Sequence, residues 1–197
     1  MNLRNNNRGT TLIELIVVIS VAGFLAFMAG VGIMIFFAKW TELNLYSDLQ
    51  IDAFNAMYSM KHGVVAGSSE DADFLGIASA DSVRFINQSG GANNYTGIMC
   101  LQSTGEQIHN NDYVEFWWDA WDGVIKMRYS YGVEQQSRPT VIFPIEHKDD
   151  ITVTNLSFRA GNNQNDVVLM TLEARIKISD NKVRKVKYQT YVAIGIT

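Results

Sequence analysis

The sequence predicts an α+β fold in which one long N-terminal helix is followed by an antiparallel β-sheet. Three patterns predict it. An apolar run extends from Leu15 to Ala38, apolar side chains then recur at three- and four-residue spacing, and the second half of the chain alternates apolar and polar residues. The first two patterns are typical of helices and the third is typical of strands.

The run from Leu15 to Ala38 predicts a membrane-spanning helix. At about 1.5 Å per residue it extends roughly 36 Å, whereas the hydrocarbon core of a bilayer is about 30 Å thick. The run is also longer than the apolar part of a secretory signal peptide, which has about 7–15 residues. Arg4 and Arg8 precede it, and positive flanks stay in the cytoplasm. We therefore expect a cytoplasmic N-terminus and an external C-terminal part.

The helix is expected to continue beyond the apolar run. The apolar positions that recur at helical spacing are Leu43, Tyr46, Leu49, Ala53, Ala56, Met57 and Met60. Polar residues lie between them, and Gly63 is a natural stop. The pattern predicts one helix from Thr11 to His62.

The rest of the chain predicts strands after a polar connector at 64–82. The expected strands are 83–87, 95–101, 113–118, 124–131, 151–158, 167–178 and 183–196. In the last two, apolar and polar residues alternate, and Ser179–Lys182 forms the turn between them. These two strands predict a hairpin with one buried face.

The segment Gly9-Thr10-Thr11-Leu12-Ile13-Glu14, followed by the long apolar run, resembles the type III signal of type IV pilins and pseudopilins. The resemblance implies that a prepilin peptidase cleaves between Gly9 and Thr10. It also implies N-methylation of the new N-terminus and a glutamate, Glu14, as the fifth residue of the processed chain. The family usually has phenylalanine at the position that Thr10 occupies.

A carboxylate within an apolar helix requires an explanation, because a charge at the centre of a membrane helix costs about 2.5–3.5 kcal/mol on insertion scales. Cleavage after Gly9 would expose a cationic amine on Thr10. Opposite charges attract strongly in an apolar layer, so our hypothesis is that Glu14 pairs with the Thr10 amine of a neighbouring subunit. Such a pair would act on the register of assembly more than on stability.

The layout of the whole chain resembles the pilin fold, and its late strands look like those of J-type minor pseudopilins of type II secretion or related minor pilins. The resemblance implies a leader at 1–9, a transmembrane and filament-core helix at 10–38, an amphipathic helix at 39–63 and an external β-rich domain at 64–197. Many major pilins carry a C-terminal disulfide loop, whereas Cys100 is the single cysteine here. This difference favours a minor subunit.

The resemblance also implies partners and a location. The partners would be a prepilin peptidase, other major and minor pilins or pseudopilins, and an inner-membrane assembly platform with its ATPase. The subunit would cross the bacterial inner membrane once and enter a filament, with its C-terminal domain periplasmic or extracellular. The sequence does not distinguish whether this filament is a secretion pseudopilus, a type IV pilus or part of a DNA-uptake machine.

The aromatic segment from Phe116 to Trp121 has three interpretations. Alternation places Phe116 and Trp118 on one face of a strand and Trp117 on the other, so part of the segment is expected in the core. Trp117, Trp118 and Trp121 could instead form a subunit interface, or stack on a sugar ring. The alternative function is therefore a membrane-anchored external module that binds carbohydrate or protein.

Composition argues against nucleic-acid binding and catalysis. After the first nine residues, 20 acidic side chains outnumber 14 basic ones, which disfavours contact with phosphate backbones. The basic residues from Lys182 to Lys187 are interpreted as protecting a sheet edge. We find no nucleophile elbow, phosphate-binding glycine loop or paired histidines, because His62, His109 and His147 are far apart. We predict no enzymatic activity and no cofactor.

The clustered carboxylates and the cysteine are interpreted as structural residues without a binding role. Glu70, Asp71 and Asp73 lack the regular ligand spacing of a calcium loop, and we interpret them as solvated. The pairs Asp119/Asp122 and Asp149/Asp150 are interpreted in the same way, so no metal site is predicted. Cys100 lies in an apolar strand-like run and is expected to be a buried thiol.

Overall fold

The computed structural model describes residues 11–63, 76–88, 94–101, 113–131, 134–135, 138–145, 149–161, 166–179 and 182–195. The chain forms two compact units, Met1–Asn44 and Leu45–Thr197. One helix, α1 (Leu12–His62), contributes to both units. Its bounds confirm the continuous helix that was predicted from Thr11 to His62.

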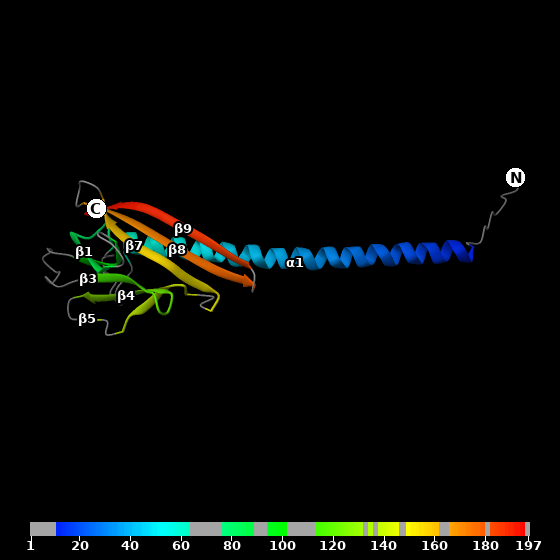
Figure 1. Ribbon diagram of the computed structural model, residues 1–197, viewed down its shortest axis with the longest axis horizontal. Coiled ribbons are helices and arrows are strands. Elements are labelled where there is room, and N and C mark those ends of the chain that lie inside the picture. The colour runs from blue at the N-terminus through cyan, green and yellow to red at the C-terminus, as the bar shows by residue number, and fades with distance from the viewer. Residues whose placement is uncertain are drawn as a thin grey trace, which may run out of the picture. The chain divides into compact units, whose positions relative to one another are not determined.

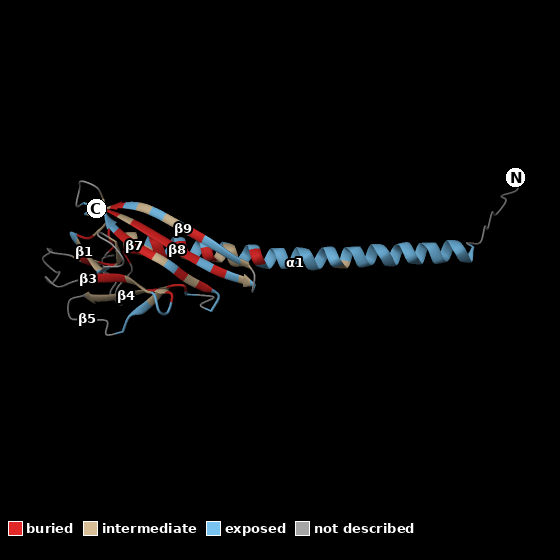
Figure 2. Ribbon diagram, viewed as in Figure 1, coloured by how far each residue is buried: buried red, intermediate tan, exposed pale blue. Residues whose placement is uncertain are grey.

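The first part of α1, residues 12–44, is exposed along most of its length. Figure 2 shows this part in pale blue, and its large apolar side chains are exposed, from Leu12 at 75% to Met34 at 74%. By length and composition this stretch could cross a membrane, and none of its most apolar window is buried. Two hydroxyl groups within it bond to carbonyls of the helix itself, because Ser20 Oγ donates to Ile16 O at 2.8 Å and Thr41 Oγ1 donates to Phe37 O at 3.0 Å.

The second part of α1, residues 45–62, packs on the sheet. The last five residues of the predicted series are all buried, namely Leu49, Ala53, Ala56, Met57 and Met60. The first two differ, because Leu43 is 62% exposed and Tyr46 is only partly buried. The five buried residues lie in one core with the sheet's inner side chains, and each large apolar side chain buried in this way contributes about 1.5–3 kcal/mol.

The helix ends at a glycine, as predicted. Gly63 has φ 93°, a conformation that glycine adopts without a Cβ clash, and its N–H donates to Ser59 O at 2.7 Å. Gly76 then lies against this end, since a Cβ there would come within 2.2 Å of Gly63 N. The close approach allows the N–H of Ile77 to donate to Met60 O at 3.1 Å.

The described strands form one antiparallel, curled sheet (Figure 1). They are β1 (Ser82–Gln88), β2 (Tyr95–Leu101), β3 (Tyr113–Asp119), β4 (Val124–Tyr131), β5 (Glu134–Gln135), β6 (Thr140–Phe143), β7 (Ile151–Ala160), β8 (Val167–Ser179) and β9 (Lys182–Ala193). The order is β5-β4-β3-β2-β7-β8-β9, with β1 on β2 and β6 on β4. The α+β fold class is confirmed, and the layout is consistent with the pilin fold.

Two sequence predictions about the strands were incomplete. The short strands β5 and β6 were missed, since two- and four-residue elements show too little alternation to be recognised. The last strand was expected to reach Ile196 but ends at Ala193. Gly195, at φ 70°, follows that end.

The core lies between the second part of α1 and the inner face of the sheet. Its largest fully buried side chains include Phe116, Phe143 and Phe158. Cys100 is 0% exposed, which confirms the predicted buried thiol, and burial raises the pKa of this thiol to about 12.

Candidate assembly site

The beginning of α1 carries a reciprocal cap. The N–H of Thr11 donates to Glu14 Oε2 at 2.8 Å, and the N–H of Glu14 donates to Thr11 Oγ1 at 3.3 Å. This is a capping box, in which the side chain of each of two residues at the helix start accepts a hydrogen bond from the backbone N–H of the other. The Thr11-x-x-Glu14 spacing was a signal for it that the sequence interpretation missed.

The cap places Glu14 in the first turn of the helix, where the helix dipole favours a negative charge. The side chain is exposed, so it remains accessible to a cation from outside the chain. Gly9 and Thr10, the predicted processing residues, lie outside the described residues. The arrangement shows Glu14 bound to the N–H of the residue that follows Thr10.

From Leu15 to Phe37, the exposed side chains of α1 are almost all apolar. Leu15, Val18 and Phe24 are each more than half exposed, and the same holds for many apolar side chains as far as Phe37. Exposed apolar surface of this extent marks a membrane or interaction surface. The start of the chain therefore combines a basic segment, a capped carboxylate and an uncovered apolar helix.

Residues 4–30 match the prokaryotic N-terminal methylation motif. This motif is the type IV pilin-like prepilin signal, and the match contains Gly9, Thr10 and Glu14. Proteins that carry the motif are structural subunits. No match was found for this chain among curated proteins or among solved structures.

The aromatic segment is divided between the core and the surface. Phe116 is fully buried and Trp118 packs partly against the core, which confirms that part of the segment is core. Trp117 is half-buried on β3. Trp121 is 97% exposed, in the turn between β3 and β4. Of the three tryptophans proposed for an interface, only Trp121 presents almost its whole side chain to solvent.

The pair Asp119/Asp122 forms ion pairs with a lysine. Lys126 Nζ lies 2.7 Å from Asp119 Oδ2 and 2.7 Å from Asp122 Oδ2. The hydrogen bond from Lys126 lowers the pKa of Asp119, and the hydrogen bond to Asp119 raises the pKa of Lys126. Within the described residues no three metal-ligating side chains come together. The stretch 70–73, His109 and His147 lie outside them.

The basic residues of β9 lie at an edge, because β9 ends the strand order of the sheet. Arg175 and Lys185 are directly opposite in the register, while Lys187 Nζ pairs with Glu173 Oε1 at 2.8 Å. Exposed lysines on an edge strand discourage pairing with another strand. This position agrees with the interpretation of the segment as edge protection.

Proposed function

We propose that this protein is a minor pilin or pseudopilin whose precursor is cleaved between Gly9 and Thr10. The observation that carries the proposal is the methylation motif at residues 4–30 in front of an exposed apolar helix. The α+β layout with its curled sheet supports it. After cleavage, residues 10–38 serve as membrane anchor and filament core, residues 39–63 extend that helix, and residues 64–197 form the external domain.

The assembly role rests on Glu14. Cleavage creates an amine on Thr10, and a neighbouring subunit's Glu14 meets it in the apolar layer, where the attraction is much stronger than in water. A helix added one step out of position would leave both charges unpaired. The pair therefore selects the register of assembly.

The subunit primes or caps a filament. Its apolar helix needs either lipid or other helices around it, so starting a filament requires several helices to leave the membrane together. A prepilin peptidase, other pilins or pseudopilins, and an inner-membrane platform with its ATPase are the partners of this process. The single cysteine and the resemblance of the late strands to those of J-type minor pseudopilins favour the minor role over a load-bearing major one.

The first experiment is intact-mass and N-terminal analysis of the full chain extracted from membranes of cells that process other prepilins. We expect a chain that begins at Thr10, with or without one added methyl group. A Gly9→Val variant is the control and should retain residues 1–9. A wild-type chain that also retains them would overturn the proposal.

A second experiment separates the charge of Glu14 from its role in the cap. Glu14→Gln keeps a side-chain oxygen for the N–H of Thr11, since glutamine also forms capping boxes, but removes the charge. Glu14→Ala removes both. We expect both variants to lose filament assembly, measured as sheared filaments in cells that remain competent with the wild-type chain. Normal assembly by Glu14→Gln would restrict Glu14 to capping.

The alternative function is a membrane-anchored binding module for carbohydrate or protein, and the exposure of Trp121 favours it. Processing distinguishes the two functions, because only a pilin-like subunit requires cleavage after Gly9. Retention of the leader together with oligosaccharide binding that Trp121→Ala abolishes would establish the module.

A further inference from the structure

Trp121 is held in a well-ordered turn, Asp119–Gly123, which we call the Trp121 turn. The N–H groups of Trp121 and Asp122 donate to Asp119 Oδ1 at 3.1 and 3.3 Å, and Gly123 N–H donates to Asp119 O at 2.8 Å. The turn is also tied to β7, because Val153 N–H donates to Gly123 O at 2.8 Å. The backbone that carries Trp121 is therefore fixed before binding, which lowers the conformational entropy that is lost when the turn binds a partner.

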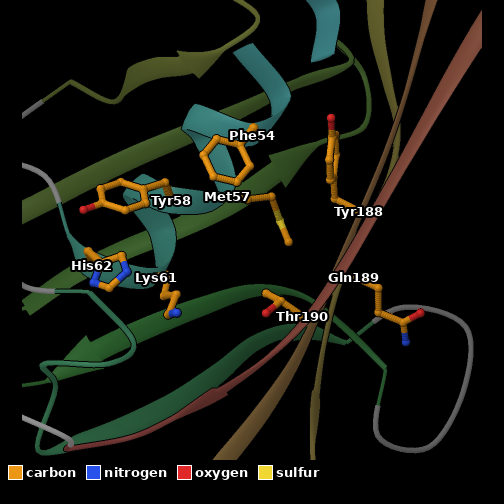
Figure 3. Close-up of a pocket in the computed structure, with 8 residues that line it drawn as sticks. All are labelled: Phe54, Met57, Tyr58, Lys61, His62, Tyr188, Gln189 and Thr190. Atoms are coloured by element: carbon orange, nitrogen blue, oxygen red, sulfur yellow. The ribbon is translucent and has the colours of Figure 1, made fainter. Parts of the chain in front are cut away.

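A groove lies between the second part of α1 and β9, within the same compact unit as the Trp121 turn. We call it the α1–β9 groove, and its volume is about 390 Å³. Figure 3 shows its lining residues: Phe54, Met57, Tyr58, Lys61, His62, Tyr188, Gln189 and Thr190. Small-ligand pockets have volumes of about 300–1,000 Å³, so the groove is large enough for an aromatic side chain.

The groove is mostly aromatic on the helix side. Phe54 and Tyr58 are 57% and 55% exposed, and the rings of Tyr58 and His62 lie 4.4 Å apart. On the strand side, Tyr188 is held in place by its hydroxyl, which donates to Gln50 O at 3.2 Å. These side chains leave an open, ordered surface of the kind that accepts a tryptophan.

The charges of the turn and the groove are complementary. Two carboxylates, Asp119 and Asp122, share the single ammonium of Lys126, so the turn has a net negative charge around Trp121. The groove lining includes Lys61 and His62 and no carboxylate. Trp121 is 97% exposed, so the groove of its own chain does not hold it.

We propose that Trp121 of one copy of this protein docks in the α1–β9 groove of a second copy. The inference rests on the proposed filament function. The turn and the groove are different surfaces of each copy, so a docking that is not reciprocal is heterologous and leaves one turn and one groove of the pair free for further subunits. Two external domains joined in this way bring two membrane helices together, as the priming of a filament requires.

Photo-crosslinking of the full chain in membranes tests the contact. Trp121 is replaced by p-benzoylphenylalanine in one tagged copy, and a second copy carries a different tag. We expect a crosslinked dimer whose adducts map to residues 54–62 or 188–190 of the second copy. The control places the same photo-reactive residue at Ile145, which is 65% exposed and lies neither in the Trp121 turn nor in the groove lining. If both probes gave adducts in the groove of the second copy with equal yield, the proposal would be overturned.

Affinity in detergent solution provides the second measurement. Trp121→Ala should weaken self-association by about 30-fold, as expected for an interface hot spot. Phe54→Ala in the groove should have a similar effect, and Ile145→Ala, outside the turn and the groove, should have little. Unchanged self-association of Trp121→Ala by analytical ultracentrifugation would overturn the proposal.

The outcomes also separate this inference from the proposed function. A chain that starts at Thr10 and shows no Trp121 crosslink to the groove overturns the docking alone. A chain that keeps residues 1–9 overturns the filament function, whatever the crosslink shows. Crosslinking of Trp121 only to other subunits also overturns the docking, because it assigns the turn to a different partner.

Discussion

The two parts of α1 belong to one helix, but only the second is covered by the protein's own sheet. Leu25 in the first part is 61% exposed, whereas Leu49 in the second is fully buried. Both parts are helical and rich in apolar residues. The difference shows that the second part is stabilised by burial within the chain, while the first needs an apolar environment from outside it.

The largest expected effect on stability is seen when a carboxylate is placed in the second part of α1 and compared with one in the first part. Leu49→Asp buries a charge without a partner, which costs several kcal/mol against a total stability of about 5–15 kcal/mol. We expect it to unfold the external domain, so that a thiol reagent labels Cys100 without denaturant. Leu25→Asp should leave Cys100 protected and weaken retention in the membrane. Labelling of Cys100 in both variants would break the distinction between the two parts.

The same distinction applies within the aromatic segment. Phe116→Ala removes a fully buried ring and should lower the free energy of unfolding by about 3–5 kcal/mol. Trp121→Ala is the matched control and should change it by less than about 0.5 kcal/mol, because its side chain is exposed. Denaturant titration of the full chain, followed by Cys100 labelling, measures both. A large loss for Trp121→Ala would mean that the indole supports the fold.

A smaller effect is expected at the cap of the exposed part. Thr11→Ala removes the acceptor for the N–H of Glu14 and should destabilise the first helical turn by about 1 kcal/mol. Hydrogen exchange at residues 12–15 should become faster. Thr41→Ala is the control, because its hydroxyl donates to a carbonyl within the helix and caps no terminus. Equal exchange at residues 12–15 in Thr11→Ala and the wild-type chain would show that the capping box contributes nothing measurable.

The smallest effect concerns the ion pairs of the Trp121 turn. The pKa of Asp119 is lowered in the folded state, so its stabilising contribution is present above the unfolded pKa of about 4 and is lost as the pH falls through the folded value. The pKa of Lys126 is raised, so its contribution is lost only above about pH 10. We expect Asp119→Asn to cost less than about 1 kcal/mol at pH 7 and a smaller amount at pH 2.

Unfolding of Asp119→Asn, Asp149→Asn and the wild-type chain at the two pH values would measure this effect. Asp149 is exposed and serves as the control for removing one carboxylate. A cost for Asp119→Asn that stays the same at both pH values would assign the effect to the backbone hydrogen bonds of the turn instead of the ion pair.

Much of the fold could be predicted from patterns along the chain. The spacing of Leu49, Ala53 and Met60 predicted the buried face of α1, and alternation predicted the β8–β9 hairpin. The cap between Thr11 and Glu14 was also readable and was missed. Strands β5 and β6 were not predictable, because they are too short for a pattern and depend on pairing with β4.

The candidate functional residues also divide into some that the sequence predicted and some that only the structure shows. Gly9, Thr10 and Glu14 could be proposed from adjacent residues, because a peptidase signal is a local pattern, and the motif match contains all three. The exposure of Trp121 and the ion pairs of Lys126 depend on how the turn between β3 and β4 is folded. The α1–β9 groove brings together residues that are distant in the sequence, so no single stretch carried a signal for it.

The sequence by itself determined the long helix, the apolar membrane-length run and the processing motif, because each depends on neighbouring residues and on helical period. Only the tertiary structure decided how completely the predicted face of α1 is covered and where the apolar residues beside that face lie. Ala53 and Met57 are buried, whereas Phe54 and Tyr58 on the same turns stay exposed beside β9. The reason is physical, because burial depends on which side of the helix the distant strands pack against.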